Sequence, residues 1–358
     1  MYACMQDKAS WQQKVDDSVM VGPRLHGWGT FPLNGPNGMH PDSPLFHGTK
    51  DYEDVRQLVD HYANMPDEHQ PTFLKTYNWI PPESYKALAR YAKERGFKLS
   101  GHMPRTMTLA DVIDAGQNSI AHARLFIFDC SSQQAELRSG QHWDTPLVDL
   151  YPMLIQAFEE DTCVSRYEQM AEKQVFLNPT LMTRRNDYYG VAGKFSDMLG
   201  TDYGHYLLAM EWEEDIAQHG TNISQEGIAA FRDFYHLSAA TVAQASKHGV
   251  VLLAGTDSWS EYNVPGFSLH EELQAMSAAG IDNFTVLQAA TINGAKYFGI
   301  DDRIGSITVG KVADLIMLDS NPILDISNTL DINTVFQGKV IYKAEHIEGL
   351  KCNPPRKK

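Results

Sequence analysis

A short apolar run, Val250 to Ala254, ends abruptly in the polar sequence Gly-Thr-Asp at residues 255–257. Five aliphatic residues are too few for an ordinary helix and are typical of a strand buried in a parallel sheet. Parallel α/β barrels build their active sites at the carboxyl ends of their strands, so Asp257 is a candidate catalytic carboxylate. The alternative is that Asp257 only caps the helix that follows.

The same alternation of strands and helices runs through most of the chain. Amphipathic patterns predict helices, and strands of this spacing with helices between them imply a parallel sheet. Polar residues 1–20 also have a roughly helical pattern. The expected strands are residues 23–30, 72–77, 97–103, 117–123, 175–180 and 250–254, and the expected helices are 51–64, 82–95, 109–115, 146–174, 269–279 and 283–298, with a helical insertion at about 186–247.

The pattern changes after Gly299, where residues 304–343 alternate like antiparallel strands without helices between them. We therefore predict two parts: a barrel over residues 1–303, which includes the helical insertion, and a C-terminal β appendage with its basic tail over residues 304–358.

The charge and cysteine content narrow the class of protein. A net charge of −15, from 45 acidic and 30 basic residues, opposes binding to nucleic acid or anionic membranes, so a small-molecule substrate fits better. No apolar run is long enough to span a membrane. The four cysteines are scattered without a CxxC pair and are interpreted as reduced or incidental thiols. The compartment, cytoplasmic or periplasmic, is left open, and a homo-oligomer is compatible with this composition.

Four side chains with metal-binding potential follow or end the predicted strands: Lys75, His102, His122 and Asp257. A single histidine is more often a hydrogen-bonded core or surface residue than a ligand, but four such residues at one end of a barrel are a specific pattern. The lysine ammonium repels metal ions, whereas the deprotonated amine reacts with carbon dioxide to give a carbamate that binds like a carboxylate.

The chain resembles the amidohydrolase superfamily, in its branch of imidazolonepropionase-like proteins and Xaa-Pro dipeptidases (prolidases). The resemblance rests on the segments GPRLHGWG, FLKTYNWIPPESY, SGHMP, QNSIAHA, LNPT, LAGTDS, VPGFSLHEELQAM, AATINGAKYFG and GSITVGKVADLIMLD, in this order. It implies an α/β fold, a (β/α)8 TIM-type barrel with a small C-terminal β-sandwich piece. It also implies that carboxylated Lys75 bridges two metals, that His102 and His122 bind the second metal, and that Asp257 binds the first. Zinc suits such ligands best.

One part of the family pattern is missing. The family has an HxH pair on its first barrel strand, and no HxH occurs in this sequence. About six strands are recognisable, and the segment from Val21 resembles the family's third strand. We therefore expect a barrel truncated at its N-terminal side, and a catalytically inert or fragmentary amidohydrolase-like protein is one alternative.

The leading hypothesis is a metal-dependent hydrolase that cleaves C–N bonds of amides or dipeptides with metal-activated water. Asp257 would act as general base, and Tyr77 could donate a hydrogen bond to the oxyanion or be a packed barrel residue. Arg184 and Arg185 could bind a substrate carboxylate or be solvated surface charges. A further alternative is a lactone or phosphoester hydrolase on the same barrel.

Overall fold

The structure is a computed structural model, and it describes residues 8–17, 19–36, 46–195, 198–203, 210, 212–214, 223–258, 260 and 262–350. The basic tail and much of the predicted insertion lie outside these residues. The chain forms two compact units. Unit 1 holds residues 1–121, 135–141 and 172–175, and unit 2 holds residues 122–134, 142–171 and 176–358. The predicted boundary at residue 303 divides the chain differently and stays a prediction.

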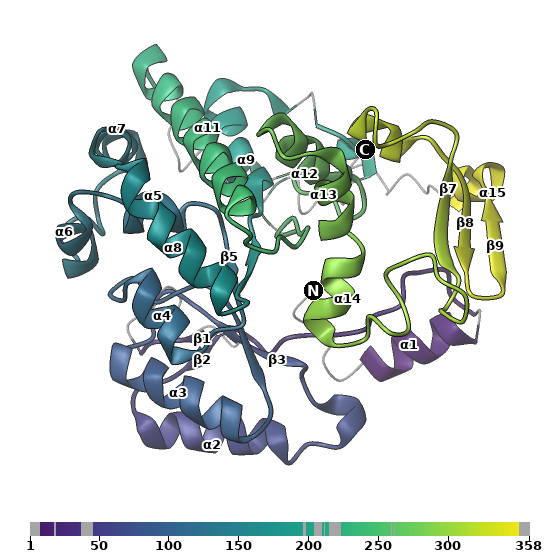
Figure 1. The fold of residues 1–358 in the computed structure, drawn as a ribbon, viewed down its shortest axis with the longest axis horizontal. Coiled ribbons are helices and arrows are strands. Elements are labelled where there is room, and N and C mark those ends of the chain that lie inside the picture. Colours follow the sequence, from purple (N-terminus) through teal and green to yellow (C-terminus); the bar gives the residue numbers. More distant parts are fainter. Residues whose placement is uncertain are drawn as a thin grey trace. The chain divides into compact units, whose positions relative to one another are not determined.

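The fold is α/β, with a parallel sheet of six strands in the order β2-β1-β3-β4-β5-β6 (Figure 1). Strand β1 pairs in parallel with β2 and β3, and β4 pairs in parallel with β3 and β5, as the alternation of strands and helices predicts. The strands are β1 Leu33–Asn34, β2 His47–Gly48, β3 Phe73–Thr76, β4 Lys98–Gly101, β5 Ser119–Ala121 and β6 Phe176–Asn178.

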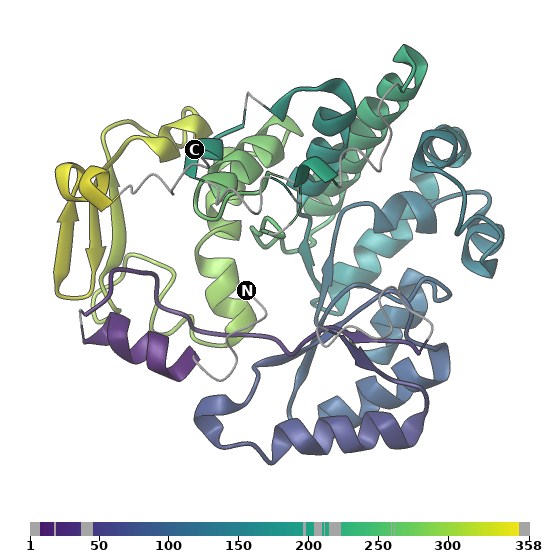
Figure 2. The same cartoon turned by 180° about the vertical axis from the view of Figure 1, so that it is seen from behind.

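Two helices of unit 1, α2 and α4, begin at residues whose side chains cap them. The side chain of Asp51 accepts hydrogen bonds from the backbone N–H groups of Glu53 and Asp54 at the start of α2. Thr108 forms a capping box with Asp111 at the start of α4, and Gly116 ends that helix in the left-handed conformation. Helices α2 and α3 lie side by side (Figures 1 and 2). The helices are α1 Lys8–Asp16, α2 Tyr52–Ala63, α3 Pro82–Glu94, α4 Leu109–Ala115 and α6 Gln134–Ser139, with a short η1 Asp67–His69.

In unit 2 the long helix α11 packs against α9 and α7, as Figure 1 shows. Tyr151 of α7 stacks on Phe234 of α11 with ring centroids 3.8 Å apart. The helices are α5 Leu125–Asp129, α7 Leu147–Ala157, α8 Glu160–Glu172, α9 Leu181–Ala192, α11 Gln225–Lys247, α12 Phe267–Ala278, α13 Asn283–Ala289 and α14 Ile292–Phe298, with a short η3 Thr201–Tyr203.

The C-terminal part of unit 2 is a separate antiparallel sheet in the order β7-β8-β9, seen from behind in Figure 2. Its strands are β7 Asp314–Leu318, β8 Ile332–Gln337 and β9 Val340–Lys343. The short helix η4 Ile326–Leu330 connects the first two, and α15 Ala344–Leu350 follows the last. The prediction of antiparallel strands near the C-terminus is thereby confirmed.

The structure corrects several local predictions. The expected strand 23–30 is reduced to one bridge between Gly29 and Phe73, and the expected strand 250–254 to one between Leu252 and Leu177. The predicted helix 146–174 breaks at Phe158, which has an extended backbone, and the predicted helix 283–298 breaks at Thr291. Helical periodicity continues across both breaks because it reports burial and not the backbone of a single residue.

The interpretation of the cysteines as separate thiols is wrong for two of them. Cys130 and Cys163 form a disulfide, with their Cα atoms 5.2 Å apart. The two cysteines are 33 positions apart in the chain, so no sequence spacing could pair them before the helices α5 and α8 were placed.

Candidate functional site

Three of the four predicted ligand residues lie in or directly after an observed strand, as the sequence predicts, and the fourth, Asp257, follows an isolated bridge. Lys75 is the third residue of β3, and His102 directly follows β4. His122 directly follows β5, and Asp257 lies five residues beyond the Leu252 bridge. Lys75 and His102 belong to unit 1, whereas His122 and Asp257 belong to unit 2.

Lys75 lies against a glycine of the neighbouring strand. In the register of β3 and β4, Thr76 pairs with Gly101, which has a φ of +122°. A Cβ added to Gly101 would lie 2.6 Å from the carbonyl oxygen of Thr76 and 3.3 Å from Cγ of Lys75. The absence of a side chain at Gly101 therefore leaves the space that the half-buried Lys75 stem occupies.

His102 is buried, at 8% exposure, and its ring is held on two sides. Its Nδ1 lies 2.8 Å from Oδ1 of Asn78, and the ring of Tyr77 stacks on it with centroids 4.3 Å apart. An amide oxygen can only accept, so with this amide orientation Nδ1 of His102 carries the hydrogen. In the neutral ring the lone pair is then on Nε2, which is the arrangement found in metal-binding histidines.

His122 is held in a similar way in unit 2. Its Nδ1 lies 2.6 Å from Oγ1 of Thr180, and its backbone N–H donates to the carbonyl of Asn178 at 2.9 Å. On the other side of the ring, Nε2 of His122 lies 4.0 Å from Oδ2 of Asp257. Two predicted ligands are therefore close neighbours within this unit.

Three residues of this group have left-handed backbones, which is unusual for residues other than glycine. The φ angles are +73° at His122, +44° at Thr180 and +55° at Asp257. Such conformations cost on the order of 1–3 kcal/mol each and collect at functional sites, where the surrounding structure enforces them. The strain supports a functional role for this end of the strands.

Asn78, Thr180 and Glu272 are site residues that sequence reasoning missed. Glu272 of α12 is fully buried and accepts hydrogen bonds from the backbone N–H groups of Leu181 and Met182. Burial raises the pKa of this carboxyl to about 7, and the two N–H groups and Arg185 oppose that shift. The available signal was an acidic residue on the buried face of a helix in HEELQAM, which is costly without a partner.

Both predicted substrate-binding arginines are engaged in ion pairs. Arg184 binds Asp187 at 2.5 Å and donates to the hydroxyl of Tyr151 at 3.0 Å. Arg185 binds Glu271 at 2.8 Å. These partners show that neither arginine is merely a solvated surface charge, while the binding of a substrate carboxylate stays a prediction.

The fit of a metal can be judged from the donor atoms. The hydrogen bond to Asn78 gives His102 the tautomer that a metal ligand needs, and the same holds for His122 if its Nδ1 donates to Thr180. Within the residues that the structure describes, no three His, Cys, Asp or Glu side chains gather as a metal-binding group. The carbamate of Lys75 would add a donor beyond these residue types.

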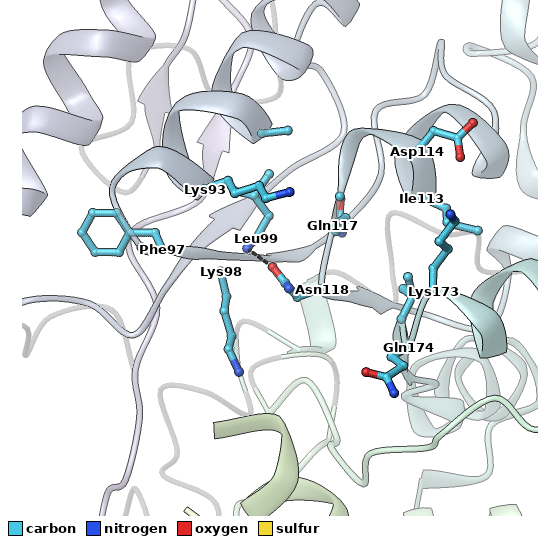
Figure 3. A pocket seen from close by; sticks show the side chains of 14 residues that line it. Lys93, Phe97, Lys98, Leu99, Ile113, Asp114, Gln117, Asn118, Lys173 and Gln174 are labelled. Atoms are coloured by element: carbon cyan, nitrogen blue, oxygen red, sulfur yellow. Dashed lines mark hydrogen bonds between the residues drawn. The ribbon is translucent and has the colours of Figure 1, made fainter. Parts of the chain in front are cut away.

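A pocket of about 490 Å3 in unit 1 lies at the amino ends of β4 and β5 (Figure 3). Lys98 begins β4 at its wall, and Asn118, which accepts a hydrogen bond from the N–H of Leu99 at 2.9 Å, precedes β5. Lys75 and His102 lie at the carboxyl ends of their strands, so this pocket is distinct from the predicted site.

The chain belongs to the amidohydrolase family, whose sequence pattern matches residues 17–354.

The curated relatives match shorter segments. A 5-methylthioadenosine/S-adenosylhomocysteine deaminase from Teredinibacter turnerae is 37% identical over 86 residues, which is 22% of this chain and 20% of the relative. Adenine deaminase 1 from Desulfotalea psychrophila is 52% identical over 42 residues, which is 12% of this chain and 7% of the relative. The matched segments thus span a fifth or less of these two relatives.

Solved structures share the fold over most of the chain. A bottromycin amidohydrolase superposes with a TM-score of 0.73 at 18% identity, covering 96% of this chain and 70% of the other. A Xaa-Pro dipeptidase crystallised with methionine in its active site gives a TM-score of 0.60 at 18% identity, covering 94% and 72%. Across the described residues, none of the helices has the length and apolar character that crossing a membrane requires.

Proposed function

We propose that this chain is a metal-dependent hydrolase that cleaves a C–N bond in an amide or dipeptide. The observation that carries the proposal is the hydrogen bonding of the two histidines. Asn78 and Thr180 contact the Nδ1 atoms of His102 and His122, which favours Nε2 as the ligand atom in each ring. The names of the relatives, deaminases and a dipeptidase, also favour hydrolysis of C–N bonds.

The proposed metal ligands are carboxylated Lys75, His102, His122 and Asp257, and the proposed metal is zinc. When bound, a divalent metal lowers the pKa of a water molecule and polarises the scissile carbonyl. This combined ligand set rests on the position of each residue at its strand end and on the family resemblance.

The protein groups supply proton transfer and orientation. Asp257 takes a proton from the attacking water and passes it to the leaving amine. The Tyr77 hydroxyl donates to the oxygen that gains charge, while its ring keeps His102 in place. A substrate carboxylate would bind Arg184 or Arg185 in competition with Asp187 or Glu271.

The test combines metal analysis with two kinds of substrate. Purified protein is loaded with zinc, dialysed, and measured for metal by mass spectrometry. It is then assayed on a Xaa-Pro dipeptide panel for amino-acid release and on 5-methylthioadenosine for ammonia release. We expect bound zinc and dipeptide cleavage that a chelator abolishes. Ammonia release without dipeptide cleavage would show that the chain is a deaminase and not a peptidase. Cleavage only of lactones or phosphoesters would favour the alternative of a lactone or phosphoester hydrolase.

Variants assign the ligands. Lys75→Ala and His102→Ala should lose metal and hydrolysis with the fold retained, whereas His61→Ala, a histidine of α2, should keep both. A short carboxylic acid should partly restore Lys75→Ala by occupying the space of the carbamate. A wild-type protein that binds no metal and hydrolyses nothing would establish the inert alternative.

A further inference from the structure

The first turn of α9 is clamped by a carboxylate from a distant part of the chain. Oε1 of Glu272 accepts from the N–H of Leu181 at 2.9 Å, and Oε2 accepts from the N–H of Met182 at 2.8 Å. The Glu272 side chain is completely buried. Both oxygens are therefore committed to fixing where this helix begins.

The residue directly before this turn is Thr180, which contacts His122. Thr180 is buried in the left-handed conformation, with φ 44° and ψ 51°. A β-branched residue is a genuine outlier in this region, so the conformation must be enforced by its surroundings. Its Oγ1 lies 2.6 Å from Nδ1 of His122. Any shift in the start of α9 therefore moves the group that holds this imidazole.

We propose that Glu272 is a positioning residue that fixes the ring orientation and tautomer of His122 through Thr180. By holding the N–H groups of Leu181 and Met182, it keeps the Thr180 hydroxyl where it accepts the hydrogen of Nδ1. The lone pair of His122 is then confined to Nε2, the atom that faces Asp257. The importance of the His122 orientation for catalysis rests on the proposed function, but the control of the His122 ring by Glu272 does not depend on that function.

The neighbouring glutamate provides a matched control. Glu271 is also buried on α12, but its Oε1 accepts from Arg185 at 2.8 Å and from the N–H of Leu199 at 3.3 Å. Glu272→Gln turns an NH2 group toward one of the two N–H donors of α9, whereas Glu271→Gln leaves that turn untouched. Both variants remove one buried carboxylate from the same helix, so a general loss of stability affects both.

The first measurement is the tautomer of His122 in metal-free protein. Long-range proton–nitrogen NMR spectra of protein labelled with 15N-histidine are recorded at pH 8, and His122→Gln identifies the signal. We expect the Nδ1–H tautomer in the wild type and in Glu271→Gln, and a mixture in Glu272→Gln and in Thr180→Val. A wild-type ring protonated at Nε2, or an unchanged tautomer in Thr180→Val, would overturn the proposal without reference to Glu272.

The second measurement is zinc affinity by competition with a chelating dye. Loss of an outer hydrogen-bond partner weakens metal binding by about 10- to 100-fold, and we expect this for Glu272→Gln but not for Glu271→Gln. The double variant Glu272→Gln, Thr180→Val should bind zinc no more weakly than the weaker-binding of the two single variants, because both substitutions act on His122 through the same contact. If Glu272→Gln does not fold, Glu272→Asp, which keeps the charge on a shorter stem, replaces it.

Additive losses, or a wild-type tautomer and zinc affinity in the Glu272 variants, would refute the positioning role. A wild type that binds no zinc would refute the proposed function, while the NMR comparison would still decide the role of Glu272.

Discussion

The ring of Tyr77 stacks on the ring of His102, with centroids 4.3 Å and planes 26° apart. Two roles of the tyrosine can be separated by mutation, because the ring makes this contact and the hydroxyl is the proposed oxyanion donor. Removing a single oxyanion donor typically lowers kcat by about 100- to 1000-fold. Tyr77→Phe should therefore reduce kcat by this factor in a zinc-loaded dipeptide assay and leave zinc content unchanged. Tyr77→Ala should also weaken zinc binding. Wild-type kcat in Tyr77→Phe would identify Tyr77 as a packing residue only.

Gly101 offers a prediction about Lys75. Gly101→Ala places a Cβ 2.6 Å from the Thr76 carbonyl oxygen and 3.3 Å from Cγ of Lys75. Gly96→Ala is the matched control, because Gly96 also has a positive φ, of +80°, with nothing within 4 Å of the added Cβ. Both variants suffer backbone strain, but only Gly101→Ala adds overpacking, worth about 1–3 kcal/mol. Denaturant unfolding should show this difference, and only Gly101→Ala should lose bound metal. Equal losses of stability would contradict the predicted overpacking at Gly101.

Glu272 should give the stability a dependence on pH. Burial raises its pKa from 4.5 to about 7. Between these two pH values the folded protein binds more protons than the unfolded chain, so the free energy of unfolding falls as pH rises through the window and is level above it. The difference amounts to roughly 3 kcal/mol, on the relation of 1.36 kcal/mol for each pKa unit. Glu272→Gln should lack this decline in urea unfolding from pH 4.5 to 7.5. A parallel decline in the variant would assign it to other groups.

The disulfide between Cys130 and Cys163 should contribute measurably to stability. A cross-link between residues 33 positions apart lowers the conformational entropy of the unfolded chain. In the chain-entropy treatment this raises the free energy of unfolding by about 3–4 kcal/mol. The double variant Cys130→Ser, Cys163→Ser should therefore unfold at lower denaturant concentration than the wild type. A reducing agent should lower the midpoint of the wild type and leave the variant unchanged. An effect of the reductant on both proteins would point away from this cross-link.

The parallel sheet and the places of Lys75, His102 and His122 in or directly after its strands could be predicted, because each depends on local patterns. The short strands that contain Lys75 and precede His122 lie next to segments with helical periodicity, and Thr108 and Gly116 mark the ends of α4 as capping rules require. Burial and capping are written in neighbouring residues, so a sequence reveals them.

The contacts that hold the site could not be predicted, because they join distant residues. Glu272 is 91 positions from Leu181, and His122 is 58 positions from Thr180. No periodicity links such pairs until the strands and helices are placed. The apolar run 250–254 predicts a buried strand, but an apolar run reports which side chains are buried and not how many ladder bonds form. Only the Leu252 bridge is present there.

The register of β3 and β4 also determines which kinds of evolutionary change this fold can accept. Lys75 pairs with Ser100 and Thr76 with Gly101, and side chains alternate between the two faces along a strand. Inserting or deleting one residue within β3 would turn Lys75 to the other face and bring Leu74 or Thr76 in its place, without changing a single residue type. A substitution in this strand therefore changes one side chain at a time, whereas an insertion or deletion of one residue removes the lysine from the site in a single step. The loops that flank the strand carry no such constraint, and related chains should differ in length there.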